Sequence, residues 1–244
     1  MLPSCFITGT DTDVGKTVVT ALILKGWSKQ GLSCAGIKPV ASGFELIDGE
    51  LRNSDIDSIK AASSYELPQT LINQYSFEPA IAPHIAATED GVNISEELIH
   101  ERFKDSKSRV DRIVVEGAGG WRVPLSMPII GDETGLGGEK SMEKTGLGKA
   151  NVDKKDLVGK DVSIATLAKA LNLPVILVVG MKLGCINHAL LSAEAIIGDG
   201  LPFLGWVANN PSPTFDRKTE NLETLKALMP GPFLFEVPYL CPNS

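Results

Sequence analysis

The sequence has few cysteines and no apolar segment long enough to cross a membrane. Its cysteines, Cys5, Cys34, Cys185 and Cys241, are widely separated, and none forms a Cys-x-x-Cys pair that would hold zinc. Reduced thiols in the cytoplasm are the simplest interpretation. The most apolar run, residues 173–181, contains a proline and a glycine and is typical of a buried strand. The N-terminus lacks an export signal, so we expect a cytoplasmic protein with no membrane segment.

The chain also lacks an excess of positive charge. Its formal net charge is −7 at pH 7. Nucleic-acid binding depends on a basic surface that releases counterions, so this composition argues against a nucleic-acid partner. The histidines are scattered, with no spacing typical of a metal site. Because the net charge is negative, any bound anion must be held by local groups rather than by long-range attraction.

The sequence does contain a glycine-rich turn between a short apolar run and a helical pattern. Residues 9–17 are Gly-Thr-Asp-Thr-Asp-Val-Gly-Lys-Thr. This run is typical of a phosphate-binding loop, whose backbone N–H groups and following helix N-terminus attract an anion. Its spacer is one residue longer than in the common Gly-x-x-x-x-Gly-Lys-Ser/Thr pattern. Lys16 would reach the β and γ phosphates and Thr17 a magnesium ion. The alternative is a simple strand-to-helix turn.

Three charged residues lie where parallel strands are expected to end. Lys38 follows the strand-like residues 34–37 and begins either a binding loop or a solvated turn. Asp55 precedes an amphipathic stretch, residues 56–62, so Ser54 or Asp55 caps this helix, or Asp55 binds a metal. Glu116 follows a β-branched run and precedes a glycine-rich loop. A P-loop ATPase would place a second magnesium carboxylate there, although a chance Glu-Gly turn gives the same pattern.

Two later stretches also follow predicted strands. Residues 182–187 precede a helix expected over residues 188–197, and their amides suit a second anion such as a carboxylate. Asn209 follows the predicted strand at residues 203–208, where its amide either binds a base edge or stabilises a turn.

Strand and helix patterns alternate along the chain. They predict a single-domain α/β fold of the P-loop NTPase type over residues 1–244, with a mostly parallel sheet covered by helices on both faces. Residues 68–83 are expected to be irregular, with a helix beginning at Pro83. Residues 131–161 mix Gly, Lys and Glu without a helical or strand period, which predicts a mobile surface insertion.

Seven co-linear stretches together resemble dethiobiotin synthetase, an ATP-dependent family that forms the ureido ring in biotin biosynthesis. They are residues 9–17, 38–43, 52–55, 83–84, 115–121, 182–188 and 206–209. The resemblance implies that 7,8-diaminononanoate and CO2 form a carbamate, which ATP activates as a carbamic-phosphoric anhydride before the second amine closes the ring. It implies Mg2+ as the cofactor and a homodimer whose active site lies at the subunit interface.

The resemblance also implies roles for individual residues. Catalytic roles fall to Thr12, Lys16 and Lys38, and magnesium ligands are Thr17, Asp55 and Glu116. ATP is bound by Asp13, Val14, Gly15, Lys16, Thr17, Val18, Asp55, Glu116, Gly117, Ala118, Gly119, Asn209, Asn210, Pro238, Tyr239 and Leu240. Substrate is bound by Ser42 and by Gly184, Cys185 and Asn187, the last three from the opposite subunit.

Two other functions are compatible with a phosphate-binding loop. One is a related P-loop amidoligase or synthetase that acts on another amine or carboxylate. The other is a nucleotide-switched ATPase that binds a partner, like the division-site and partitioning ATPases. Those proteins typically carry an extra lysine early in the loop, where this chain has Thr10 and Asp11.

Overall fold

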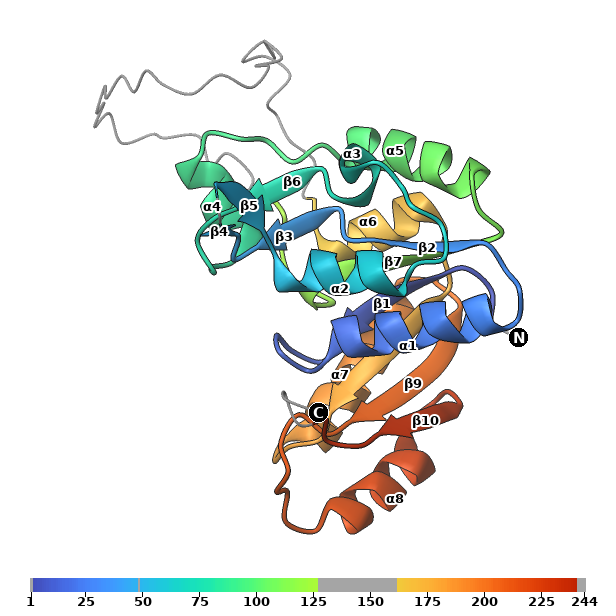
Figure 1. Cartoon of the computed structure of the whole chain (residues 1–244). Coiled ribbons are helices and arrows are strands. Elements are labelled where there is room, and N and C mark those ends of the chain that lie inside the picture. The colour runs from blue at the N-terminus through green and yellow to red at the C-terminus, as the bar shows by residue number, and fades with distance from the viewer. Residues whose placement is uncertain (1, 48, 127–161, 241–244) are drawn as a thin grey trace, which may run out of the picture.

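The computed structural model describes residues 2–47, 49–126 and 162–240. At its centre is a six-stranded sheet with the strand order β10, β9, β8, β1, β7, β2 (Figure 1). These strands are β1 (Cys5–Gly9), β2 (Cys34–Ile37), β7 (Arg112–Gly120), β8 (Val175–Gly180), β9 (Phe203–Asn209) and β10 (Phe233–Val237). All neighbours are parallel, because a helix lies in every connection between them. The predicted parallel sheet is confirmed.

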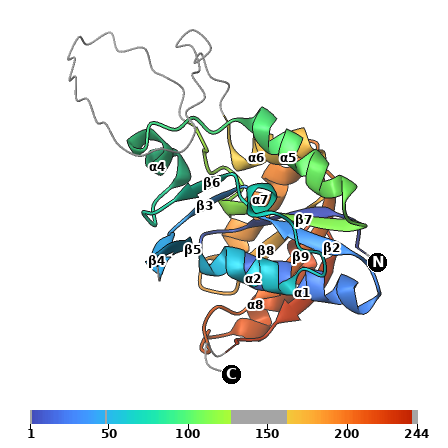
Figure 2. The same cartoon turned by 45° about the horizontal axis from the view of Figure 1, so that its top comes forward.

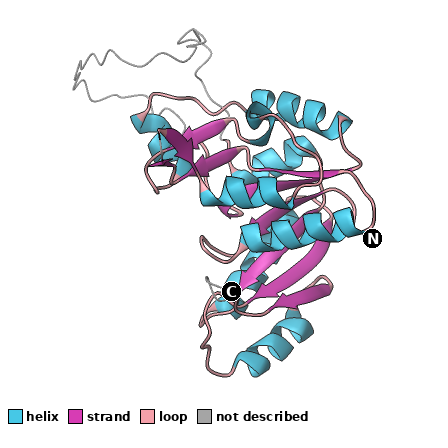
Figure 3. Ribbon diagram, viewed as in Figure 1, coloured by secondary structure: helices cyan, strands magenta, loops and turns pink. Residues whose placement is uncertain are grey.

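Helices cover both faces of this sheet (Figure 3). On one face α1 (Lys16–Lys29) lies beside α2 (Ser54–Ala62), as Figures 1 and 2 both show. On the other face lie α5 (Glu96–Ser108), α6 (Ile164–Leu171) and α7 (Cys185–Gly198), and α8 (Lys218–Leu228) packs against α7. None of the described helices combines the length and apolar character needed to cross a bilayer.

Strand β8 shows why the sequence pattern predicts a doubly covered sheet. Every residue of the strand is buried, and successive side chains point to opposite faces. Ile176 and Val178 belong to the apolar cluster under α1, with Val19 and Trp27. Val175, Leu177 and Val179 belong to the cluster under the other helices. A strand covered on both faces is continuously apolar, as residues 175–179 are.

Smaller elements gather at the carboxyl-end edge of the sheet, on the left of Figure 1. Strand β3 (Val40–Ser42) pairs with β6 (Tyr75–Phe77), and β4 (Glu45–Ile47) pairs with β5 (Glu50–Arg52). Between and after them come α3 (Gln69–Ile72) and α4 (Pro83–Glu89). The helix start at Pro83 is confirmed, but the expectation that residues 68–83 are irregular is wrong. A three-residue strand has no visible period, and the partner of β6 is distant in sequence.

Two other boundaries differ from the predictions. Strand β7 continues through Glu116 to Gly120, because its ladder with β1 extends to the Gly9–Gly120 pair, so the glycine-rich run is strand rather than loop. Helix α7 begins at Cys185 rather than His188, after Gly184 with a φ of 93°. The predicted insertion at residues 131–161 lies outside the described residues.

Gly205 provides a test of the packing at the edge of the sheet. Its φ is +133°, and a Cβ atom added to it would lie 2.3 Å from the Pro232 carbonyl oxygen. We expect Gly205→Ala to lower the free energy of unfolding by about 2–4 kcal/mol through backbone strain and overpacking. Urea denaturation followed by circular dichroism measures this change.

Gly26→Ala is the matched control. Gly26 lies inside α1 with nothing within 4 Å of an added Cβ atom. Alanine has the higher helix propensity, so this variant should gain roughly 0.5–1 kcal/mol. Equal effects of the two substitutions would contradict the steric account of Gly205.

Candidate active site

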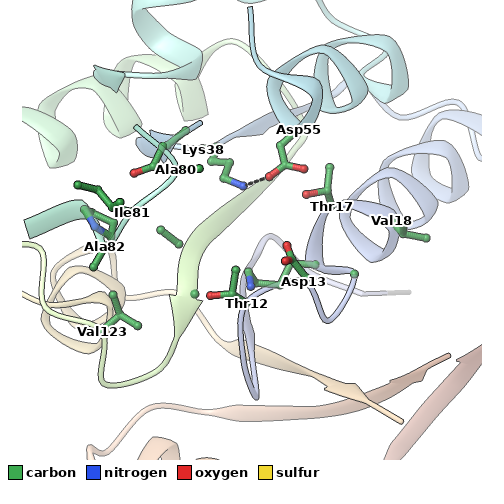
Figure 4. Close-up of a pocket in the computed structure, with 17 residues that line it drawn as sticks. Thr12, Asp13, Thr17, Val18, Lys38, Asp55, Ala80, Ile81, Ala82 and Val123 are labelled. Carbon is green, nitrogen blue, oxygen red and sulfur yellow. Dashed lines mark hydrogen bonds and ion pairs between the residues drawn. The ribbon is translucent and has the colours of Figure 1, made fainter. Parts of the chain in front are cut away.

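An open cavity of about 680 Å3 lies at the carboxyl ends of the central strands (Figure 4). The phosphate-binding loop and the start of α1 form one side, and Lys38 after β2, residues of β3 and α2, and residues 80–83 at the start of α4 form the other. The lining residues are Thr12, Asp13, Gly15, Lys16, Thr17, Val18, Lys38, Ala41, Ser42, Asp55, Ala80, Ile81, Ala82, Pro83, Ala118, Gly119 and Val123. The fold brings the separate sequence motifs together at one edge of the sheet.

The phosphate-binding loop is held against strand β9. The Asn209 side-chain amide donates a hydrogen bond to the Val14 carbonyl at 2.9 Å. Gly15, with φ +86°, lies so close that an added Cβ atom would be 2.2 Å from Asn209 Nδ2. Only glycine tolerates both this φ and this approach. Gly15 therefore lets the end of β9 support the loop just before α1 begins.

Lys16 lies under the loop rather than in solvent. It is 7% exposed, and its ammonium donates to the Asp11 carbonyl at 2.9 Å. Burial lowers the pKa of Lys16, and the Glu116 carboxylate only partly offsets this effect. An anion bound by the loop would supply a stronger partner for this ammonium.

Glu116 is the buried charge of the site. Its side chain is 0% exposed. Oε1 accepts hydrogen bonds from Thr17 Oγ1 at 2.8 Å and from Lys38 Nζ at 2.9 Å, and Oε2 accepts from Thr20 Oγ1 at 2.7 Å. A buried carboxylate is tolerated only when it is paired and hydrogen-bonded, and all three donors meet that requirement.

Lys38 links Glu116 to Asp55, its other carboxylate partner. Figure 4 shows the ion pair between Lys38 and Asp55. Burial disfavours the charged ammonium, but Glu116 and Asp55 outweigh that cost and raise the pKa of Lys38. Burial likewise favours neutral Asp55, yet the Lys38 ammonium and the Thr17 hydroxyl lower the pKa of Asp55. Lys38 is thus a permanent cation and Asp55 a permanent anion at neutral pH.

The oxygen atoms of Thr17, Asp55 and Glu116 fit a magnesium site. Thr17 donates to Glu116, and the Lys38 ammonium pairs with both Glu116 and Asp55. The three oxygen-bearing side chains therefore meet at a point where the two carboxylates attract positive charge. Within the described part of the chain there is no cluster of three or more His, Cys, Asp or Glu side chains. Mg2+ suits such a sparse set, since it binds through one or two carboxylates with water and phosphate as its other ligands.

Asn53 is a residue that the sequence interpretation missed. Its side-chain oxygen accepts from the backbone N–H groups of Asp55 and Ile56 and caps α2, so neither Ser54 nor Asp55 is the cap. Its amide nitrogen donates to the carbonyls of Ser42 and Gly43, both at 3.1 Å. Asparagine is among the strongest capping residues, which was the available signal. One side chain therefore fixes Asp55 relative to Ser42.

Other missed residues lie on the apolar side of the cavity. Ala80, Ile81, Ala82 and Val123 line it, and Ile81 is 38% exposed. They carry no charge and belong to no motif, so the sequence gives no signal for them. Their common property is an apolar surface that faces the Lys38 side of the cavity (Figure 4).

The residues expected to bind the base lie beyond the cavity lining. Asn209 contacts the loop, and Asn210 donates to the Glu236 carboxylate at 2.9 Å and the Val237 carbonyl at 2.7 Å. Residues 238–240 follow β10 and are exposed. Val14, Gly117 and Glu116 lie behind the cavity rather than in its lining.

Gly184, Cys185 and Asn187 also lie outside the cavity lining of the chain. They form the start of α7, next to Leu183, which is 90% exposed. The preceding Lys182 forms an ion pair with Asp11 of the loop at 2.7 Å, and this hydrogen bond lowers the pKa of Asp11.

The fold and the loop define a P-loop nucleotide-binding protein. A family model described as an AAA domain matches residues 4–130 and 150–242. The fold is similar to that of a ParA family ATPase from Chlorobium tepidum, with a TM-score of 0.51 and 13% identity over 98% of this chain and 85% of that one. A MinC:MinD cell division protein complex from Aquifex aeolicus gives a TM-score of 0.51 at 14% identity, covering 98% of this chain and 82% of that one.

Sequence similarity identifies the family more narrowly. The chain is 44% identical to the ATP-dependent dethiobiotin synthetase BioD of Pseudomonas paraeruginosa, over 98% of this chain and 91% of the relative. It is 40% identical to the enzyme of the same name from Aromatoleum aromaticum, over 96% of this chain and 90% of the relative. The chain therefore belongs to the dethiobiotin synthetase family, as the sequence motifs predict.

Lys38→Met tests the charge balance of the site. It leaves Asp55 and the buried Glu116 without their cation, which should cost about 3 kcal/mol of unfolding free energy at neutral pH. Without that cation the burial of Asp55 raises its pKa, so the folded variant binds a proton more readily than the unfolded chain. Its stability should then fall as the pH rises above about 4, the usual pKa of an aspartate.

The wild-type pair should contribute no such slope. Because the pKa of Asp55 is lowered, its contribution to stability is lost only as the pH falls below 3.8. Because the pKa of Lys38 is raised, its contribution is lost only as the pH rises above 10.5. Lys60→Met, at an exposed lysine of α2, is the control and should change stability by less than about 0.5 kcal/mol. A loss of stability in Lys38→Met that does not change with pH would count against the proposed charge balance. Urea denaturation at a series of pH values above about 4 measures the free energy of unfolding.

Proposed function

We propose that this protein is an ATP-dependent dethiobiotin synthetase that carboxylates 7,8-diaminononanoate with CO2 and closes the ureido ring. Its relatives carry this name at 44% identity over nearly the whole chain. The observation that carries the proposal is the position of Lys38, a buried cation that lines the same cavity as the phosphate-binding loop. A reaction between a carbamate anion and ATP needs positive charge at that point.

The loop side of the cavity would hold the phosphates. Backbone N–H groups over residues 12–17 and the N-terminus of α1 attract an anion, and Lys16 lies directly beneath them. Asn209 keeps its amide nitrogen on the Val14 carbonyl, so its amide oxygen is the group that would accept a hydrogen bond from the adenine amine. Asn210 and residues 238–240 would complete the base site.

Thr17, Asp55 and Glu116 would hold Mg2+ with the nucleotide. The ion would supply charge neutralisation for the β and γ phosphates. In this role Thr17 and Asp55, both in the cavity lining, face the nucleotide, while Glu116 lies behind them.

The other side of the cavity would hold the diamine. Ala41, Ile81 and Val123 offer apolar surface for its alkyl chain, and Ser42 and Lys38 offer polar groups for the carbamate. Thr12, which lies next to Asp13 in Figure 4 and lines the same cavity as Lys16, would contact the transferring phosphoryl group. Binding of both substrates in one cavity lowers the barrier by proximity and orientation.

Lys38 would act through its charge rather than as a base. Its raised pKa keeps it protonated at neutral pH, so it can stabilise the carbamate as this anion attacks the γ-phosphate. A bond forms between the carbamate oxygen and the γ-phosphorus, and the bond from that phosphorus to the β,γ-bridging oxygen breaks. ADP leaves with this oxygen and its electron pair, and the carbamic-phosphoric anhydride remains. The neutral second amine then attacks the carbonyl carbon, which breaks the C–O bond to the phosphoryl group, and inorganic phosphate leaves as the amine loses a proton and the urea ring closes.

A second copy of the chain would complete the site. We infer a homodimer in which Gly184, Cys185 and Asn187 at the N-terminus of α7 bind the substrate carboxylate across the interface. The exposed Leu183 beside them offers apolar surface for that contact. Cys5, Cys34 and Cys185 are buried free thiols, which suits the reducing cytoplasm.

The proposal predicts ATP turnover that depends on the diamine. With MgATP and bicarbonate, ADP and phosphate should appear only when 7,8-diaminononanoate is present, together with a product that has the mass of dethiobiotin. Lys38→Met should lower kcat by at least about 100-fold, because it removes the charge opposite the developing anion. Coupled ADP detection and mass spectrometry measure both effects.

Lys60→Met is again the control and should retain wild-type turnover. Nucleotide binding by Lys38→Met, measured by calorimetry, separates loss of chemistry from loss of ATP affinity. ATP turnover that ignores the diamine and instead responds to a protein partner would replace the synthetase by a nucleotide-switched ATPase.

A further inference from the structure

Thr20 makes a hydrogen bond that the proposed reaction does not explain by itself. It lies on α1 one turn beyond Thr17, is 0% exposed, and its hydroxyl donates to Glu116 Oε2 at 2.7 Å. It does not line the cavity. Thr20 thus donates from a buried position, on the helix that carries the phosphate-binding residues, to a buried carboxylate. This geometry suits a residue that orients the carboxylate.

The two oxygens of Glu116 are held differently. Thr17 and Lys38 both donate to Oε1, whereas Thr20 donates to Oε2. Residues three apart lie on the same face of a helix, so Thr17 and Thr20 of α1 each donate a hydrogen bond to a different oxygen of the Glu116 carboxylate. These two hydrogen bonds fix the plane of the carboxylate relative to the phosphate-binding loop. Without the Thr20 hydroxyl, Oε2 would have no hydrogen-bond donor among the residues that the structure describes.

We propose that Thr20 is a positioning residue that orients the Glu116 carboxylate for metal binding. The inference rests on the magnesium site in the proposed function, and it adds a residue that touches neither nucleotide nor metal. Hydrogen bonds behind a metal ligand typically change metal affinity or activity by about 10–100-fold. Loss of the Thr20 hydroxyl should therefore appear in metal affinity, while the loop and Lys16 continue to hold the nucleotide.

Thr8 supplies a matched control on β1, the strand that leads into the loop. It is also 0% exposed, but its hydroxyl has no hydrogen-bond partner among the residues that the structure describes. Thr20→Val and Thr8→Val remove the same atom from equally buried threonines. Only the first substitution removes a donor from Glu116.

The experiment measures Mn2+ binding by electron paramagnetic resonance, in the presence of a non-hydrolysable ATP analogue and without any diamine. We expect Thr20→Val to weaken Mn2+ binding by at least about 10-fold, and Thr20→Ser, which keeps the hydroxyl, to stay within about 3-fold of wild type. Thr8→Val should match wild type. Affinity for the analogue in EDTA should change by less than about 2-fold in all variants, because in EDTA there is no metal for Glu116 to bind.

The outcomes separate this inference from the wider proposal. Wild-type affinity in Thr20→Val, or an equal loss in Thr8→Val or Thr20→Ser, would overturn the positioning role. An equal loss of affinity in EDTA would overturn it too, since it would indicate damage to the loop. Thr20→Ala removes the hydroxyl without added bulk and answers the same question if Thr20→Val does not fold. Failure of the wild type to bind Mn2+ would overturn the metal site together with the inference, whereas absence of diamine turnover alone would leave both standing.

Discussion

The buried Glu116 carboxylate is the constraint on which the site depends. A carboxylate inside a parallel sheet is costly unless both oxygens are paired, and here α1 and Lys38, the residue after β2, supply the partners. The helix that begins at the phosphate-binding loop must therefore pack with Thr17 and Thr20 facing β7. The end of β2 must deliver Lys38 to the same point. One buried charge thus sets the relative position of elements that are far apart in sequence.

This arrangement joins the two halves of the cavity. Lys38 contacts Glu116 on the loop side and Asp55 at the start of α2, and Asn53 connects the cap of α2 to the carbonyls of Ser42 and Gly43. A shift of α2 would therefore be transmitted to the strand-end segment after β3 as well as to Lys38. Phosphoryl transfer depends on position and charge more than on a strong base, and a rigid network of this kind supplies both.

The sequence predicts the parts of this network that carry a periodic pattern or a motif. Covered strands such as β8, the helix after Gly15, and the family motifs around Lys38 and Glu116 could all be recognised. The pairing of β3 with β6 could not, because each strand has three residues and the contact is non-local. The extension of β7 beyond Glu116 depends on its ladder with β1, and glycines alone resemble a loop. The bonds of Thr20 and Asn53 depend on tertiary contacts that spacing does not encode.

The fold by itself does not decide the chemistry. A parallel sheet with a phosphate-binding loop after β1 can serve a nucleotide switch as well as a synthetase, because function depends on the groups placed around the loop. In the proposed function the distinguishing group is Lys38. Two carboxylates keep it protonated, and the fold places it 8% exposed at the edge of an apolar wall. A switch that only senses ATP has no need for a second buried lysine, besides Lys16, beside an apolar wall of the cavity. A second, anionic reactant would explain why the fold accepts the cost of burying that cation there.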